Sequence, residues 1–141
     1  ALMLNGVPVD EAVIAEGNFT CRSGYDAMGK ILDSGRTIDA VVCGNDQMAI
    51  GALFCLKERG VRVPEDVAVA GFNDNVPASL ITPSLTTMRV PKAEMGSCAF
   101  DLFQRRDRGD QSTRMLIQLG SELIIRQSTD AGAQTTWELD W

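Results

Sequence analysis

Three short clusters of amide and carboxylate side chains are the groups in this sequence best suited to binding a small polar molecule. Each follows a short apolar run: Asn18, then Asn45–Asp46, then Asn73–Asp74–Asn75. Amides and carboxylates donate and accept hydrogen bonds, which suits them to the hydroxyl groups of a ligand. Phe19 lies beside the first cluster, and an exposed aromatic ring there would stack on the apolar face of a sugar or a base.

The sequence offers few groups for catalysis. It contains no histidine, which excludes Ser-His-Asp and Cys-His mechanisms. We find no glycine-rich phosphate-binding motif, no metal-ligand pattern and no convincing pair of catalytic carboxylates. We therefore expect a binding protein without cofactor or metal rather than an enzyme, and measurable turnover of a sugar would contradict this.

Each cluster also has a structural interpretation that needs no ligand. Asn and Asp cap helices by accepting bonds from free backbone N–H groups, and we expect Asp46 to be such an N-cap. The residues from Asn73 to Asn75 can close a turn with their own side chains. An aromatic such as Phe19 at a strand end is most often part of the core. The position of the clusters after successive strands nevertheless favours an added ligand role.

Short apolar runs alternate with helical periodicity in the first half of the chain. Strands are predicted at residues 12–17, 39–44 and the end of 63–72, and helices at 20–35 and 45–60. The second and third strands are apolar without alternation, which is typical of strands covered on both faces. The pattern predicts an α/β fold with a doubly wound, mostly parallel sheet and helices on both faces. Ligands bind beyond the carboxyl ends of such strands, where the three clusters fall.

The second half of the chain predicts one more long helix between extended segments. Residues 85–90 read as a strand, and Pro91 then opens a helix whose apolar stripe contains Met95, Cys98, Ala99, Leu102 and Phe103. Two further strands are predicted over residues 114–120 and 121–129. The tail, residues 130–141, has no clear period and is expected to be loose or extended.

Composition limits the partners that this segment can bind. Of its 141 residues, 45% are hydrophobic and 23% are charged, which is typical of a globular domain. No apolar run approaches the ~20 residues of a membrane span, so no membrane partner is expected. A net charge of −6 repels phosphate backbones, so DNA would be bound only through an attached basic domain.

The cysteines and the first residues indicate the cellular setting. The four cysteines, Cys21, Cys43, Cys55 and Cys98, fit no zinc spacing and are expected to be free thiols of a reducing compartment, which favours a cytoplasmic protein. Residues 1–10 lack the basic and long apolar regions of a signal peptide. They look like the end of a helix, so we expect the chain to begin inside a larger protein.

Four motifs, in order and at matching spacing, resemble the lactose-repressor (LacI/GalR) family of bacterial regulators. They are "NDQMAIGAL" at 45–53, "GVRVPEDVAVAGFND" at 60–74, "PSLTTMRVPKAEMG" at 83–96 and "LIIRQST" at 123–129. The resemblance extends over about residues 7–129. It implies the second lobe of a two-lobed effector-binding domain like a periplasmic binding protein, without the DNA-binding headpiece and first lobe of the family.

The resemblance also implies roles for individual residues. Phe19 stands where the family stacks an aromatic ring on its effector, and Asn45 stands where an Asn binds effector hydroxyls. Asn73 stands where the family commonly has an Asp that holds two hydroxyls. Asn18 and Asp74 complete the expected ligand-binding set. Val90, where a polar residue is frequent, is a second departure that argues against a closely lactose-like pocket.

We expect three segments from this resemblance. Residues 1–84 would form the second lobe, incomplete at its start, residues 85–129 would cross to the absent first lobe and return, and residues 130–141 would be a loose tail. The helix after the crossover would lack its lobe, so its apolar stripe would need another partner. The helix over 48–56 and the segment 78–81 are further candidates for a homodimer contact.

The expected function is effector binding and dimerisation in a transcriptional repressor, with the effector shifting the arrangement of the lobes and so operator affinity. The alternative is a periplasmic sugar-binding protein of a transport system, which the free-looking cysteines and the 85–96 motif oppose. Because Asn73 removes a carboxylate that would repel an anion, we also hypothesise an acidic effector, either a sugar acid such as gluconate or a phosphorylated sugar.

Overall fold

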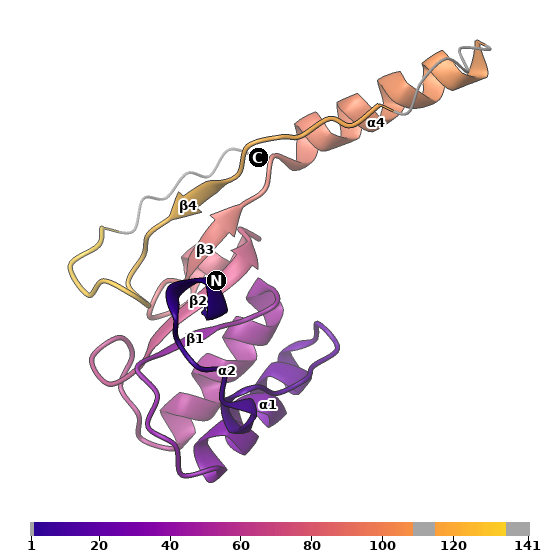
Figure 1. The fold of residues 1–141 in the computed structure, drawn as a ribbon. Coiled ribbons are helices and arrows are strands. Elements are labelled where there is room, and N and C mark those ends of the chain that lie inside the picture. Colours follow the sequence, from indigo (N-terminus) through magenta and orange to yellow (C-terminus); the bar gives the residue numbers. More distant parts are fainter. Residues whose placement is uncertain (1, 109–114, 135–141) are drawn as a thin grey trace.

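The structure is a computed structural model that describes residues 2–108 and 115–134. Its sheet has four strands in the order β1-β2-β3-β4, and they comprise Ala40–Val42, Ala68–Asn73, Thr86–Arg89 and Glu122–Ile124. The first three strands are parallel, and β4 runs antiparallel to β3 (Figure 1). The carboxyl ends of β1, β2 and β3 therefore share one edge. The α/β class and the mostly parallel sheet are confirmed.

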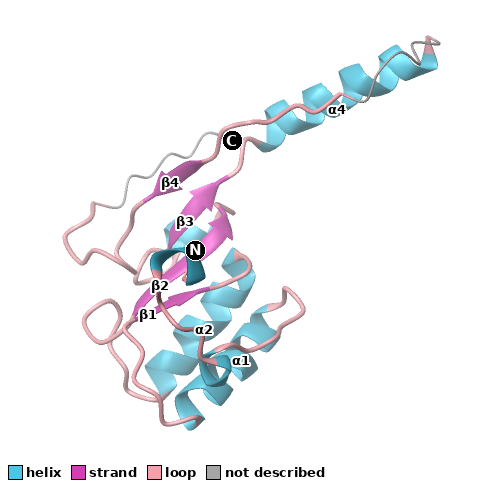
Figure 2. Ribbon diagram, in the orientation of Figure 1, coloured by secondary structure: helices cyan, strands magenta, loops and turns pink. Residues whose placement is uncertain are grey.

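Two long helices pack against the sheet. Helix α1 spans Cys21–Asp33 and helix α2 spans Asp46–Glu58; α1 packs on α2, which in turn packs on β2 (Figure 2). Thr20 caps α1 by accepting a hydrogen bond from the backbone N–H of Ser23. Both helices are followed by a glycine in the left-handed region, as the sequence predicted: Gly35 has a φ of 70° and Gly60 a φ of 72°.

The core lies between these helices and the sheet. Its largest fully buried apolar side chains are Met28, Leu56, Leu85 and Val69. Glycines let the two helices approach closely, because a Cβ on Gly51 would overlap the carbonyl oxygen of Cys21. A Cβ on Gly24 would overlap the backbone of Met48 in the same way.

The expected strand over residues 12–17 is wrong. The segment instead forms a short 3-10 helix, η2 at Glu11–Val13, followed by extended chain without a strand partner. A cavity of about 250 Å³ is lined by Val13–Ala15 and by Ala40–Val42, so the segment lies near β1 without pairing with it. The Asp10 side chain also accepts a hydrogen bond from Ala12 N, which favours a turn over a strand. An isolated apolar run cannot form a ladder, whatever its propensity.

The remaining elements are short except for α4. The 3-10 helix η1 covers Met3–Asn5 and helix α3 covers Pro77–Leu80, while α4 spans Lys92–Asp107 and projects away from the sheet in Figure 1. The expected strand over 114–120 is not formed by residues 115–120, and residue 114 lies outside the described part. Of the predicted 121–129 strand, only Glu122–Ile124 pairs. Of the tail, residues 131–132 form a turn and residues 135–141 lie outside the described part.

The sheet continues across the expected boundary at residue 84. β3 pairs with β2, and the backbone N–H of Val69 donates to the carbonyl of Ser128 at 2.9 Å. Thr86 N in turn donates to the Ser128 hydroxyl at 2.8 Å. β3 and the segment around Ser128 are therefore hydrogen-bonded to β2 or to each other.

Candidate functional site

The polar clusters of the sequence gather where the parallel strands end. Asn45 follows β1 by three residues, Asn73 is the last residue of β2, and Arg89 is the last residue of β3. Asn73 and Arg89 are register partners across the β2–β3 pair. Since ligands of open α/β sheets bind outside this edge, the geometry places the candidates where a binding crevice is expected.

Asn45, not Asp46, is the N-cap of α2, which corrects the sequence prediction. Its backbone is extended, and its Oδ1 accepts a hydrogen bond from Met48 N at 2.9 Å. Its Nδ2 donates to the carbonyl oxygen of Phe19 at 3.0 Å. One amide thus begins the helix and also holds the neighbouring loop.

Phe19 is presented to solvent rather than packed in the core. Its side chain is 63% exposed, and its ring lies against Gly44, where any side chain would touch it. Beside it, the Asn18 side chain accepts a hydrogen bond from the Thr20 hydroxyl at 2.7 Å. Ser23 Oγ accepts from Asn18 N at 3.0 Å. The loop that carries the ring is therefore hydrogen-bonded to the start of α1.

Backbone strain is concentrated at this edge. Within the described residues, the non-glycine residues with positive φ are Phe19 at 65°, Asn73 at 108° and Asp74 at 50°. Such conformations cost ~1–3 kcal/mol each and are enriched in ligand-binding sites. For a bulky residue such as Phe19 a positive φ is a clear outlier. All three belong to the predicted ligand-binding set, although none was singled out for its conformation.

Asp46 is fully buried and joins α2 to the turn after β2. Its Oδ1 accepts from the Thr87 hydroxyl at 2.5 Å, and its Oδ2 accepts from Asn75 N at 2.6 Å. A Cβ on Gly71 would collide with this carboxylate, so glycine is required at that point of β2. The second polar residue of the "ND" pair is thus structural.

Asp74 directly follows β2 and forms two ion pairs. Its Oδ2 accepts from Arg89 Nε at 2.7 Å and its Oδ1 pairs with Arg126 Nη2 at 2.8 Å. Burial by itself would raise the pKa of Asp74, but the hydrogen bonds and charges of both guanidinium groups outweigh it and lower the pKa. Arg126 is buried as well and donates to Leu85 O at 2.9 Å.

Sequence reasoning missed these basic partners. Arg89 and Arg126 are 37 residues apart in the chain and meet only because β4 returns antiparallel to β3. Lys92 was missed too: its Nζ donates to Asn75 Oδ1 at 3.0 Å. The only signal in the sequence was the presence of basic residues near the end of predicted strands.

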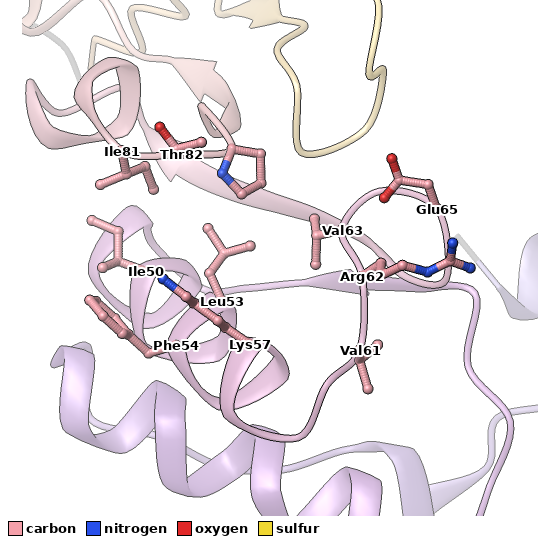
Figure 3. Close-up of a pocket in the computed structure, with 11 residues that line it drawn as sticks. Ile50, Leu53, Phe54, Lys57, Val61, Arg62, Val63, Glu65, Ile81 and Thr82 are labelled. Carbon is pink, nitrogen blue, oxygen red and sulfur yellow. The ribbon is translucent and has the colours of Figure 1, made fainter.

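A concave surface lies between α2 and residues 61–65 and 81–83. It is a hollow of about 480 Å³ with an apolar floor and a charged rim of Lys57, Arg62 and Glu65. Figure 3 shows Ile50 and Leu53 of α2 facing Ile81 and Thr82 across it. Phe54, at its side, is 59% exposed. The hollow has the chemistry of a protein contact rather than of a site for hydroxyl groups.

The cysteines carry no reactive arrangement. All four are free thiols: Cys55 is buried, Cys43 and Cys98 are half-buried, and Cys21 is exposed. Burial in the core therefore does not account for all of them. Burial raises the pKa of Cys43 to about 11, which keeps that thiol protonated. Within the part of the chain that the structure describes, no group of His, Cys, Asp or Glu is placed to hold a metal.

None of the helices in the described ranges has the length and apolar character needed to span a bilayer. The longest, α4, has 16 residues and includes charged ones throughout.

Comparisons with known proteins identify the family. The sequence profile of the periplasmic binding protein-like domain matches residues 1–129. The HTH-type transcriptional repressor PurR of Photorhabdus laumondii subsp. laumondii is 35% identical over 132 residues, which are 94% of this chain and 39% of that protein. The chain thus spans about two fifths of this curated relative.

Two solved structures share the fold at comparable identity. The transcriptional regulator CelR in complex with cellobiose is 35% identical, with a TM-score of 0.85 over 90% of this chain and 39% of that one. A LacI-family sugar-binding regulator from Escherichia coli, complexed with phosphate, is 38% identical, with a TM-score of 0.77 over 90% and 45%. Since sequence profile, sequence relatives and structural neighbours agree, this chain belongs to the periplasmic binding protein-like effector domains of the LacI/GalR family of transcriptional regulators.

Proposed function

We propose that the chain is the effector-binding and dimerisation part of a sugar-responsive transcriptional repressor that acts in the cytoplasm. The effector would be a small polyhydroxylated molecule, a sugar or a sugar acid, bound at the carboxyl ends of β1 and β2. Residues 1–84 would supply this lobe, residues 85–129 would cross to a first lobe and return, and residues 130–141 would be a tail. The chain would perform no chemistry on its ligand.

The observation that carries the proposal is the strained, exposed Phe19 held by Asn45. Its positive φ and 63% exposure cost stability that core packing does not return. A ring fixed in this way, through the 3.0 Å bond from Asn45 Nδ2, is ready to stack on a ligand. Asn73, also strained and half-buried, would then face the hydroxyls.

The ligands of two structural neighbours support a polar effector. CelR carries cellobiose and the Escherichia coli regulator carries phosphate. Asn18 would assist by positioning the loop of Phe19. Asp74, with both oxygens in ion pairs, would position Asn73 rather than bind ligand itself.

The effector would act by shifting a conformational equilibrium. A ligand changes such an equilibrium only by as much as its affinity differs between the two arrangements. Because β3 and β4 are bonded to the lobe and lead to α4, a change at the strand ends would reach the first lobe through them. DNA would be bound only by a headpiece outside this chain.

Calorimetry tests the site. Phe19→Ala and Asn45→Ala should each weaken the binding of a responding sugar by about 10-fold or more. Phe100→Ala is the matched control, since Phe100 is 58% exposed on α4 and should leave affinity unchanged. Equal affinity in all three variants would show that the ligand binds elsewhere.

The hollow on α2 supports the homodimer. Apolar Ile50, Leu53 and Ile81 line it, Phe54 is exposed beside it, and its rim carries both signs of charge. A two-fold contact brings one patch against its own copy, so a patch with both signs can pair with itself. Phe54→Glu should shift sedimentation toward monomer, whereas Phe100→Glu should do so only if α4 forms the contact instead.

A further inference from the structure

Lys92 reaches back from the start of α4 over the turn that follows β2. Its Nζ lies 3.0 Å from Asn75 Oδ1 and 3.4 Å from the carbonyl oxygen of Asp74. Asn75 N, in turn, donates to Asp46, the neighbour of Asn45 in the chain. The ammonium group thus lies at the same edge as the candidate amides, although it comes from the element that leaves the lobe.

Both contacts of this ammonium group are with neutral oxygens. In the described residues Lys92 forms no ion pair, and the two nearby carboxylates are otherwise engaged. Asp74 is bound by two guanidinium groups, and Asp46 is buried beneath the turn. Fixing a lysine side chain in one conformation costs rotamer entropy, and contacts with neutral oxygens offset little of that cost.

Two amide side chains flank the Asp74 carbonyl that Lys92 contacts, and both favour an anion. Asn73 and Asn75 are amides, and each can donate an N–H₂ hydrogen bond to a negatively charged oxygen. Neither repels an anion as a carboxylate would. A lysine binds carboxylate or phosphate as a point charge, without demanding one geometry.

We propose that Lys92, together with the amides of Asn73 and Asn75, forms a subsite for a negatively charged carboxylate or phosphate group of the effector. This rests on the proposed effector-binding function and narrows its ligand class to anionic polyols. It also makes ligand binding depend on α4, because the cation belongs to that helix while the amides belong to the lobe. An effector held here would bridge the two.

Calorimetry on the protein with glucose, gluconate, glucose 6-phosphate and inorganic phosphate tests the subsite. Lys92→Gln should lower the affinity for whichever anion binds by about 10- to 100-fold, the loss expected for a charge-assisted hydrogen bond. Lys30→Gln, the same charge change at an exposed position of α1, is the control and should change affinity less than about 2-fold at moderate salt. Gluconate against glucose 6-phosphate separates a carboxylate from a phosphate.

Added salt should weaken binding of the anion to the parent protein and to Lys30→Gln. It should weaken binding to Lys92→Gln much less. If Lys92→Gln binds glucose as tightly as the parent and no anion binds to either protein, the subsite is overturned and the proposed function stays intact. An equal loss of anion affinity in Lys30→Gln and Lys92→Gln would mean that only the net charge of the protein matters. That result would also overturn the subsite. No saturable binding of gluconate, glucose 6-phosphate or phosphate would also overturn the subsite, whereas the proposed function would be contradicted only if neutral sugars such as cellobiose failed to bind as well.

Discussion

The α1–α2 pair and the α4 helix differ sharply in how they use their apolar residues. α1 and α2 bury most of theirs, with Met28, Ala52 and Leu56 almost inaccessible to solvent. α4 has 16 residues and none of those described is buried. Its Phe100 and Phe103 are 58% and 66% exposed, and in Figure 1 the helix extends away from the sheet.

This difference indicates where the fold is stabilised. The lobe holds together through close helix packing and a buried polar network, whereas α4 is attached mainly through the strand before it and the chain after it. A stripe of apolar residues on a helix predicts burial, but it does not provide the partner. Relatives more than twice as long as this chain are consistent with a partner outside it.

The largest expected effect is at the closest helix contact in the lobe. Gly51→Ala places a methyl group on the carbonyl of Cys21, so the backbones of α1 and α2 must move apart at this point. We expect the free energy of unfolding to fall by about 3 kcal/mol or more. Urea denaturation followed by circular dichroism measures it, and a loss below about 1 kcal/mol would mean that the helices pack more loosely than described.

Breaking the ion pairs of Asp74 should have the next largest effect. Asp74→Asn leaves the buried Arg126 without its carboxylate, whereas Arg89, 40% exposed, keeps its ion pair with Glu122 at 3.6 Å. The expected loss is about 2 kcal/mol at neutral pH, less than for a fully buried pair. A variant as stable as the parent would show that the network positions the turn without stabilising the lobe.

The unfolding free energy lost in Asp74→Asn should depend on pH. Because the pKa of Asp74 is lower in the folded chain than in the unfolded one, its contribution is fully present above the unfolded value of about 3.9. It disappears as the pH falls through the folded pKa. The difference in unfolding free energy between parent and Asp74→Asn should therefore be constant above about pH 5 and shrink below about pH 4. A gap that widens in acid would contradict the lowered pKa.

A glycine-to-alanine substitution, which should destabilise the protein in α2, should stabilise α4. Gly96 has no atom within contact distance of a built Cβ, so Gly96→Ala meets open space. Alanine favours a helix over glycine by about 0.5–1 kcal/mol, and α4 should become more resistant to fraying by that amount. Hydrogen exchange of its backbone amides measures this directly. A destabilising Gly96→Ala would reveal a neighbour packed closely on α4.

The smallest effect is expected for the exposed aromatic face of α4. Phe100→Ser should change the stability of the monomeric chain by less than about 0.5 kcal/mol, since the ring is largely in water and the two residues have similar helix propensity. Thermal unfolding at low concentration is the measurement. A loss above about 2 kcal/mol would mean that α4 is packed against a partner in solution. Its apolar residues would then be buried like those of α1 and α2.

Local patterns determined much of this protein. The helices at 20–35 and 45–60, the glycines that end them and the apolar strands before Asn45 and Asn73 follow from periodicity and turn chemistry. The parallel order of those strands was enough to bring the two clusters to one edge. The family followed from motif order, which the comparisons confirmed.

Tertiary structure decided what each polar residue does. Asn45 caps α2 and Asp46 is buried because Thr87 and Asn75 N, 41 and 29 positions away, come within hydrogen-bonding distance of its carboxylate. Residues 12–17 fail as a strand because a strand needs a neighbour, which no local sequence specifies. Propensity and capping act over a few residues and can be read from the chain. Ion pairs, ladders and cavities depend on segments that only the fold brings together.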